Sequence, residues 1–360
     1  MSKLTARQAA AFPPCRLHYV TDTKPGITRR KKGKIYHYFA PGGTRITEAA
    51  TILRINALAI PPAYKHVWIC PTVQGHLQAT GVDSRGRKQY RYHPQWRAER
   101  EANKFDHILY FGEKLPAIRK QVASDITLPG LPREKVMATI VQLLEKTLIR
   151  VGNAEYARDN HSYGLTTLRT KHVKLKGGQI TFKFTGKSGK QWNLSIDDRR
   201  IAGIIKKCED IPGQELFKYI DDNGHAIEIT SADVNAYLQL ISGERFTAKD
   251  YRTWSATVLA ALALKEFETF DSETEAKKNI LRAIENVSKR LGNTPTICRK
   301  SYIHPEVINA YMDGDFIKLV EREIEKEFLT KYRDLKKEEM MVLAMLHKRL
   351  AKKTRKSATR

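Results

Sequence analysis

The stretch LGNTPTICRKSYIHP contains a tyrosine, Tyr302, whose neighbours do not suit a buried core position. The residues around it are polar or basic: Arg299, Lys300, Ser301 and His304. A core tyrosine would have apolar neighbours at helical spacing. Because a tyrosine hydroxyl can act as a covalent nucleophile, this segment is a candidate reactive site. Asn293, directly after the glycine that ends the preceding helical pattern, is a second polar residue to explain.

Three basic residues elsewhere could act with such a tyrosine on a phosphodiester. Arg150 ends an apolar helix predicted over residues 133–150, and Lys187 lies in the hairpin sequence FTGKSGK. Arg252 lies in the first turn of another apolar helix, where the helix dipole disfavours a cation. Arginines can hold non-bridging oxygens and neutralise transition-state charge, and a lysine can protonate a leaving alkoxide. The set suits metal-independent phosphoryl transfer.

Each of these residues also has a purely structural interpretation. Arg150 could favour the negative end of its helix, which is worth about 0.3–1 kcal/mol. Lys187 could be an exposed lysine at a hairpin tip. For Arg252 the structural interpretation is weaker, since a cation placed there at some cost indicates an anionic partner.

Other site chemistries find no support in the sequence. The GKS at Gly186 lacks the glycine that a phosphate-binding loop requires five residues earlier, where Thr181 stands. No HExxH, GxSxG or metal-spaced carboxylate cluster occurs. No CxxC pair occurs among the four cysteines, which argues against a disulfide framework and a zinc site: Cys15, Cys70, Cys208 and Cys298. We therefore expect neither a metal nor a nucleotide cofactor.

The elements that must position these residues fall into two groups. Residues 1–34 are expected to be irregular, and residues 35–95 to form short strands and turns with a short helix over 47–55. From about residue 97 the pattern becomes helical, interrupted by a three-stranded antiparallel sheet over HVKL, QITFKF and QWNLSI. Helices are predicted to begin after Asp197 or Asp198, and after Thr230, Thr247 and Ser272. A long charged helix is expected to cover 315–350 before a basic tail, 352–360.

Two basic segments of the N-terminal part could contact phosphates. The first closes the irregular arm and is either a solvated charge run or a phosphate-contacting arm: Arg29, Arg30, Lys31, Lys32 and Lys34. In the second, SRGRKQYRYHP, basic side chains interleave with Gln and Tyr: Arg85, Arg87, Lys88, Gln89, Tyr90, Arg91 and Tyr92. On a strand, Tyr90 and Tyr92 would share one face. A solvated edge strand would look similar, but this mixture is what a DNA-groove reader needs.

Composition agrees with a nucleic-acid partner. The chain has 360 residues, 41% of them hydrophobic, which suffices for a core and suggests two domains. Lys and Arg number 64 against 39 Asp and Glu, giving a formal charge of +25. Such an excess favours a polyanion, with an anionic membrane surface as the alternative. No apolar run reaches the length of a membrane span and no signal peptide is recognisable, so we expect a cytoplasmic, nucleoid-associated protein.

In this order, the residues resemble the type IB DNA topoisomerases, in particular their small bacterial and poxvirus-like branch. The matching segments run from about residue 26 to 312: RRKKGKIYHY, LAIPPAYKHVWICP, GHLQATGVDSRGRKQYRYHP, IRVGN, YGLTTLRTKHV, FTGKSGKQW, KDYRTW and LGNTPTICRKSYIHP. The resemblance implies an α+β protein, with a β-rich DNA-clamp domain (1–98) and a larger helical catalytic domain (99–360) of the topoisomerase IB and tyrosine recombinase type.

The resemblance also implies roles for individual residues. Tyr302 corresponds to the nucleophile that joins the 3′-phosphate, Lys187 to the general acid, and Arg150 and Arg252 to the catalytic arginines. Asn293 stands where the poxvirus pattern has histidine, so its side chain can hydrogen-bond an oxygen but cannot transfer a proton. DNA contacts are assigned to the two N-terminal segments, above all Gln89, Tyr90 and Tyr92, and to Lys249. The implied activity is relaxation of supercoiled duplex DNA by a monomer that closes around it, without ATP, metal or membrane.

Two other functions compete with this one. A tyrosine recombinase would share the catalytic fold and the order Arg, Lys, Arg, Tyr. Recombinases, however, usually place histidine three residues before the second arginine, where this chain has Lys249, and they lack a domain like VDSRGRKQYRYHP. A non-enzymatic architectural DNA binder would explain the charge of +25 but not the hairpin lysine together with the tyrosine motif.

Overall fold

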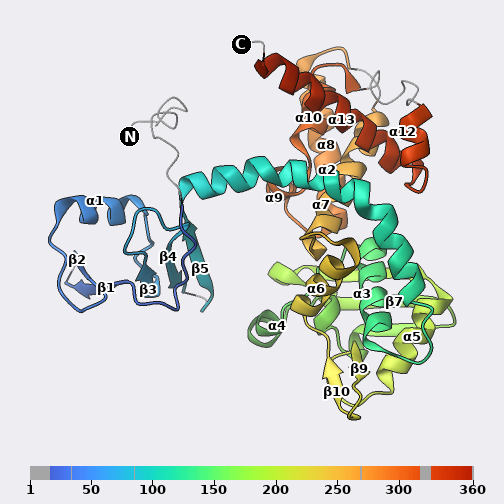
Figure 1. The fold of residues 1–360 in the computed structure, drawn as a ribbon, viewed down its shortest axis with the longest axis horizontal. Coiled ribbons are helices and arrows are strands. Elements are labelled where there is room, and N and C mark those ends of the chain that lie inside the picture. The colour runs from blue at the N-terminus through green and yellow to red at the C-terminus, as the bar shows by residue number, and fades with distance from the viewer. Residues whose placement is uncertain (1–16, 34, 85, 268–269, 317–325, 359–360) are drawn as a thin grey trace. The chain divides into compact units, whose positions relative to one another are not determined.

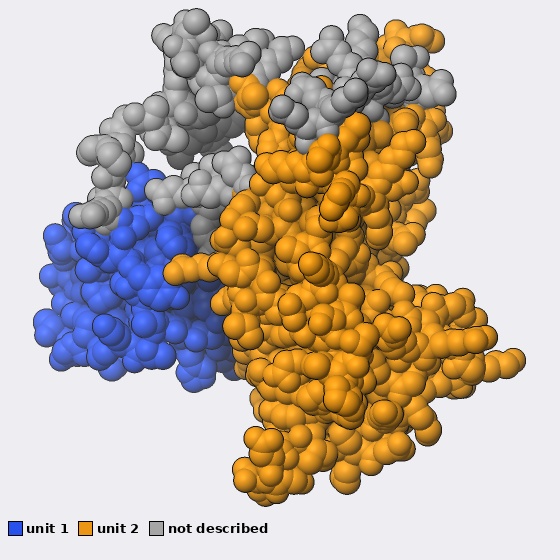
Figure 2. Space-filling view, turned by 45° about the vertical axis from the view of Figure 1, so that its right-hand side comes forward, with its two compact units in different colours: residues 1–104 blue, residues 105–360 orange. Residues whose placement is uncertain are grey.

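The computed structural model describes residues 17–33, 35–84, 86–267, 270–316 and 326–358. The chain forms two compact units, Met1–Lys104 and Phe105–Arg360, which Figure 2 colours separately. The boundary expected from the sequence was 98/99. Cys15, Lys34 and Arg85 lie outside the described residues.

The first unit is built on one antiparallel sheet with strand order β2-β1-β3-β4-β5. Its elements are β1 (Ile27–Lys32), β2 (Ile35–Phe39), α1 (Ala49–Ala57), β3 (Lys65–Ile69), β4 (Leu77–Val82) and β5 (Lys88–Tyr92). A small core lies between the sheet and α1: Ile27, Ile55, Val67, Ile69 and Ala79. The predicted β-rich N-terminal region, with its short helix, is confirmed.

The prediction that residues 1–34 are irregular is wrong for β1. This strand pairs with β2 from Thr28↔Phe39 to Lys32↔Ile35, and Gly33 after it has a φ of +64°. The sequence ITRRKK has almost no apolar alternation, because only Ile27 reaches the core. Backbone pairing holds this strand, and a hydrophobicity pattern does not report backbone pairing. The first four residues of the basic cluster, Arg29 to Lys32, therefore belong to the sheet and not to a free arm.

The second unit is mostly helical (Figure 1). Its helices are α2 (Pro94–Asp125, which begins in the first unit), α3 (Arg133–Thr147), α4 (Ala154–Asn160), α5 (Arg199–Glu209), α6 (Ser231–Ser242), α7 (Ala248–Lys265), α8 (Glu273–Leu291), α9 (Pro295–Ser301), α10 (Pro305–Met312), α12 (Lys326–Lys331) and α13 (Lys337–Ala358). Its strands are β6 (Val173–Lys176), β7 (Gln179–Thr185), β8 (Gln191–Asp197), β9 (Lys218–Ile220) and β10 (Ala226–Glu228). The sheet β6-β7-β8 confirms the prediction, whereas the hairpin β9-β10 was not foreseen.

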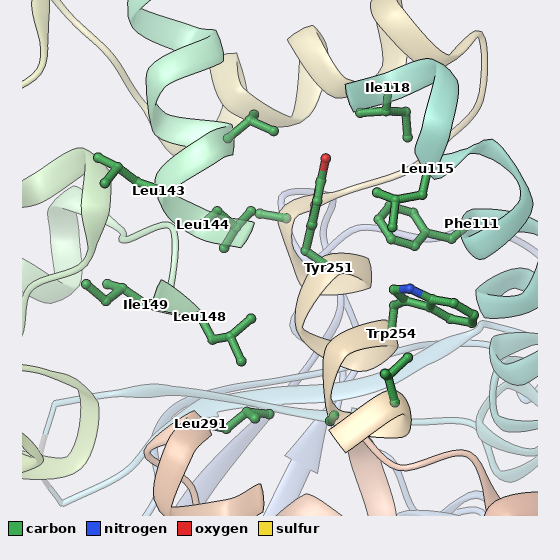
Figure 3. Packing of buried hydrophobic residues seen from close by; sticks show 14 of the residues in the cluster. Phe111, Leu115, Ile118, Leu143, Leu144, Leu148, Ile149, Tyr251, Trp254 and Leu291 are labelled. Carbon is green, nitrogen blue, oxygen red and sulfur yellow. The ribbon is translucent and has the colours of Figure 1, made fainter. Parts of the chain in front are cut away.

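Helix α7 runs through the core of this unit. The ring of Tyr251 projects between Leu144 of α3 and Leu115 of α2, and Trp254 lies beside Phe111 (Figure 3). A Cβ on Gly112 would approach the Trp254 ring to 2.6 Å, so α2 needs a glycine there to pack this closely. This packing fixes α7 rigidly, and α7 carries one of the candidate catalytic residues.

Several helix ends follow the sequence signals, and others do not. Side chains of Thr230 and Ser272 cap α6 and α8 as predicted, and Thr247 with Asp250 forms the expected capping box of α7. Of the two starts left open for α5, Asp197 and Asp198, the cap is Asp198. The long helix predicted over 315–350 is wrong: α12 ends at Lys331 and α13 begins at Lys337.

The turn between α12 and α13 buries Tyr332 and Leu335, and the Lys336 amide donates to the Glu339 carboxylate, which starts α13. These tertiary contacts interrupt the helix without a proline or glycine signal. The expected basic tail is helical as far as Ala358. None of the helices that the structure describes is long and apolar enough to cross a membrane.

Candidate active site

A cavity of about 260 Å³ in the second unit collects the four basic and phenolic residues singled out above. Arg150, Lys187, Arg252 and Tyr302 all line it, although they come from distant parts of the sequence. The remaining lining residues are Val151, Gly152, Asn153, Tyr156, Ser162, Tyr163, Ala248 and Lys249. The fold thus brings an arginine pair, a lysine and a tyrosine to one place.

Two helix ends hold the guanidinium of Arg252. Its side chain is only 3% exposed, and it donates to the carbonyl of Leu148 and, at 2.8 Å, to that of Leu291. Leu291 is the last residue of α8, and Leu148 directly follows α3. Carbonyls at helix C-termini lack intrahelical partners and carry partial negative charge. These two helix ends therefore offset part of the cost of burying a cation in the first turns of α7.

Burial lowers the pKa of Arg252 to about 10, with the neighbouring positive charge of Arg150 as the next cause. A pKa near 10 still leaves the guanidinium charged at neutral pH. Its Nε is buried and has no hydrogen-bond partner among the described residues. The site thus holds a buried cation with one donor that no described residue binds.

Arg150 lies in an irregular segment after α3 and not at a helix end, which corrects the sequence prediction. Helix α3 stops at Thr147, and Leu148 adopts a left-handed conformation with φ of +57°. The carbonyl of Arg150 accepts the Leu165 amide at 2.9 Å, and a Cβ on Gly164 would lie 2.5 Å from that oxygen. The glycine therefore lets the two segments pair closely enough to orient Arg150.

The side chain of Arg150 binds the junction between α8 and α9. It donates to the carbonyl of Gly292, at 3.3 Å, and to Oδ1 of Asn293. Burial lowers the pKa of Arg150 below its ordinary value. Gly292 has a φ of +62° and turns the chain sharply after α8, which brings the Asn293 amide to Arg150. The end of this helix at the glycine before Asn293 agrees with the sequence prediction.

Three buried donors at these residues have no partner in the described part of the chain: one terminal nitrogen of Arg150, Nε of Arg252 and Nδ2 of Asn293. A buried donor left unsatisfied costs about 1–3 kcal/mol, and native proteins contain few of them. Three donors on neighbouring residues, two of them cationic, form a site suited to an anion with several acceptor oxygens.

Tyr302 lies at the C-terminal end of α9. Its amide donates to the carbonyl of Cys298 at 3.0 Å, and its side chain is partly exposed to the cavity. The guanidinium carbon of Arg252 lies 5.4 Å from the centroid of the Tyr302 ring. The tyrosine and the second arginine are thus immediate neighbours.

Lys187 reaches the cavity from the loop between β7 and β8. Ser188 and Gly189 after it both have positive φ, at +63° and +75°, which makes the turn tight. The lysine is exposed, and its Nζ lies 5.4 Å from the centroid of the Tyr156 ring. Tyr156 lines the same cavity and was not singled out from the sequence, where it is one aromatic residue of a short polar helix.

The predicted DNA contacts of the first unit differ in how their side chains are used. Tyr90 and Tyr92 share one face of β5 as expected, exposed and stacked with centroids 6.1 Å apart. Gln89 donates to Asp83 at 3.0 Å, and Arg87 forms an ion pair with the same carboxylate. Lys88 forms an ion pair with Asp22.

Arg29 and Arg30 are adjacent on β1 but have unlike surroundings. The guanidinium of Arg29 donates to three main-chain carbonyls at 3.0–3.1 Å, those of Ile60, Pro61 and Tyr64. Arg30 is exposed and lies over the Phe39 ring. In the second unit, Lys249 is exposed at the edge of the cavity.

Comparison with known families agrees with this geometry. A family model described as "Eukaryotic DNA topoisomerase I, catalytic core" matches residues 93–328, well over half of the chain. The chain belongs to the type IB DNA topoisomerases. A second family model, "Bacterial DNA topoisomerase IB, N-terminal domain", matches residues 35–83 of this type IB enzyme.

Named relatives of this type IB topoisomerase come from viruses and a fungus. DNA topoisomerase 1B of Acanthamoeba polyphaga mimivirus is 34% identical, covering 80% of this chain and 88% of its own. DNA topoisomerase 1B of Vaccinia virus (strain Copenhagen) is 22% identical, covering 69% and 77%. DNA topoisomerase 1 of Mycosarcoma maydis is 26% identical over 62% of this chain and 25% of its own.

These matches confirm the predicted family, its poxvirus-like branch and the assignment as an enzyme of DNA relaxation. They favour a topoisomerase over a tyrosine recombinase. A solved XerH site-specific recombinase covers 61% of this chain at 14% identity, with a TM-score of 0.33, which is too low to support an argument.

Proposed function

We propose that this type IB topoisomerase relaxes supercoiled duplex DNA through a covalent bond between Tyr302 and a DNA 3′-phosphate. The observation that carries the proposal is the single cavity lined by Arg150, Lys187, Arg252 and Tyr302, with unsatisfied donors on both arginines. A phosphodiester supplies the acceptor oxygens that these donors lack, and a phosphorus atom between them would lie beside the Tyr302 hydroxyl.

In the cleavage step the Tyr302 oxygen bonds to phosphorus, the phenol proton passes to solvent, and the bond from phosphorus to the 5′-oxygen breaks. The ammonium of Lys187 gives its proton to that oxygen, which leaves as a hydroxyl. Arg150, Arg252 and the Asn293 amide hold the two non-bridging oxygens and stabilise the charge of the transition state.

Religation is the reverse of cleavage. While the 3′-phosphotyrosine persists, the free 5′-end can rotate about the intact strand and release torsion. The 5′-hydroxyl then attacks phosphorus, and Tyr302 leaves. Because the phosphotyrosine keeps the energy of the phosphodiester, neither ATP nor a metal ion is needed in this scheme.

The partner is duplex DNA, and we infer that a monomer uses both units to hold it. The exposed tyrosines of β5, with Arg30 and the lysines of β1, supply stacking and phosphate contacts on the first unit. On the second unit, Lys249 at the edge of the cavity supplies a phosphate contact. A formal charge of +25 supports phosphate contacts along both units.

The deciding experiment replaces Tyr302 by Phe. With an end-labelled duplex in excess EDTA, the unaltered enzyme should form a protein–DNA adduct that survives denaturing electrophoresis, and Tyr302→Phe should form none while still binding DNA. Tyr110→Phe is the matched control, since Tyr110 is exposed and lies outside the cavity. An adduct with Tyr302→Phe would reject the nucleophile, and an absolute magnesium requirement would reject the metal-free scheme. Strand exchange between two paired sites would favour a recombinase.

A further inference from the structure

A buried hydroxyl on α7 contacts the main chain at Tyr302 and at His304, two residues later. Thr257 has no exposed surface, and its Oγ1 accepts the His304 amide at 3.1 Å. The same hydroxyl lies 3.3 Å from the carbonyl of Tyr302 and 2.9 Å from that of Thr253, one turn earlier. A hydroxyl has one hydrogen and two lone pairs, so its donation is shared between the two carbonyls while a lone pair binds His304.

The segment that Thr257 contacts lies between two helices. Tyr302 leaves α9 with φ of −132° and ψ of −27°, and His304 caps α10. The amides of Tyr302 and Ile303 both bind the Cys298 carbonyl, which fixes the segment from the α9 side. Thr257 fixes the same segment from α7, through the carbonyl of Tyr302 and the amide of His304.

The same helix carries Arg252, five residues before Thr257. At a rise of 1.5 Å per residue, the two positions are about 7.5 Å apart along the axis. One rigid element therefore holds the arginine that would bind the phosphate and the hydroxyl that holds the main chain of the nucleophile. The distance from the Tyr302 oxygen to the bound phosphorus therefore depends on how Arg252 holds the phosphate and on how Thr257 holds the Tyr302 main chain.

The common role of a buried helical threonine is a bond to the carbonyl four residues earlier. Thr139 on α3 shows this role alone: it has no exposed surface and donates to the Lys135 carbonyl at 2.8 Å. Thr257 makes the same local bond and adds the two contacts to residues 302 and 304. These added contacts, made across 45 and 47 residues of sequence, distinguish it.

We propose that Thr257 is a positioning residue for cleavage, which holds the Tyr302 main chain at a fixed distance from Arg252. This inference rests on the proposed role of Tyr302 as the nucleophile. Thr257 does not touch the reacting atoms. It acts by keeping the phenol in line with the phosphorus, and small misplacements in such an arrangement can cost about 10²-fold in rate.

The test compares Thr257→Val with Thr139→Val in single-turnover cleavage and religation. Cleavage and religation pass through the same transition state, so misplacement of Tyr302 should slow both by a similar factor, about 10- to 100-fold. The fraction of DNA bound covalently at equilibrium should change little. Thr257→Ser, which keeps the hydroxyl, should restore the rate to within about threefold, and Thr139→Val should cleave at the unaltered rate.

Two results would overturn the positioning role. One is an unaltered rate constant in Thr257→Val with only a smaller active fraction, which would show a loss of stability. The other is a slow Thr257→Ser, because the hydroxyl would then not be what matters. If Thr257→Val does not fold, Thr257→Cys, with its weak S–H donor, takes its place under the same criteria. The nucleophile is judged separately, by whether Tyr302→Phe forms an adduct.

Discussion

At the scale of single residues, the site is organised by donors that have no partner in the described part of the chain. Two nitrogens of Arg252 donate to carbonyls at helix ends, and its Nε has no described partner. Arg150 donates to Asn293, and each of these two residues has one further buried donor without a described partner. The protein thus orients these groups before substrate arrives. Preorganised donors stabilise a transition state because they need no reorganisation during the reaction.

Lys187 allows a test of the proton-transfer step. Lys187→Ala should slow cleavage about 10²- to 10⁴-fold, the usual scale for loss of a general acid. A duplex with 5′-sulfur at the scissile bond should recover most of that rate, because a thiolate leaves without a proton. Both rates are measured in single turnovers, with Lys190→Ala as the control on the same loop. Absence of rescue by sulfur would remove Lys187 from this role.

Much of this site could be predicted from the sequence, because motifs report reactive residues. Four residues stand out in the sequence by their characteristic order, and all four line the cavity: Arg150, Lys187, Arg252 and Tyr302. Thr257 could not be found in the same way, since ATVLAAL reads as ordinary apolar helix. Arg29 was grouped with a basic run, and only the fold shows its bonds to three carbonyls.

At the scale of elements, helix ends and buried ion pairs set the geometry. The capping residues of α6, α7 and α8 are local signals and were predictable. The strand β1 and the break between α12 and α13 depend on pairing and burial across the fold, which local patterns do not contain.

The Arg119 network, which joins α2, α3 and α13, allows a test of an element-scale contact. Arg119 donates to Glu145 at 2.7 Å and to both oxygens of Glu339 at 2.8 Å. Although burial raises the pKa of Glu339, the hydrogen bonds and charge of Arg119 lower it below its ordinary value. Glu339→Gln should therefore reduce the free energy of unfolding at pH 7 by about 1–3 kcal/mol.

The pH dependence of that difference has a definite sign. A carboxyl whose pKa is lower in the folded state stabilises the fold above its unfolded pKa and stops doing so as pH falls through its folded pKa. The difference in the free energy of unfolding between Glu339→Gln and the unaltered protein, measured in urea, should shrink below about pH 4.5. Glu338→Gln, exposed on the same helix, should show no gap. A gap that stays constant down to pH 3 would contradict the assignment.

At the scale of the whole molecule, the charge of +25 makes DNA affinity a property of many contacts. Each neutralised phosphate releases condensed counterions, so the logarithm of affinity falls with that of salt concentration by about 0.9 per contact. Binding of Tyr302→Phe protein to a short duplex, measured between 50 and 200 mM salt, should therefore weaken steeply. A shallow dependence would mean that few of the basic residues meet phosphates.

Two neighbouring arginines of β1 allow phosphate contact to be tested separately from stability. Arg30 is exposed, so Arg30→Gln should reduce the salt slope by about one and leave unfolding unchanged. Arg29→Gln should do the reverse, because its guanidinium satisfies three carbonyls of the first unit: it should lower the melting temperature and keep the slope. If both variants change only the slope, Arg29 also meets DNA and the carbonyl contacts are incidental. If neither changes the slope, the phosphates are bound elsewhere on the protein, and β1 is a structural strand that happens to be basic.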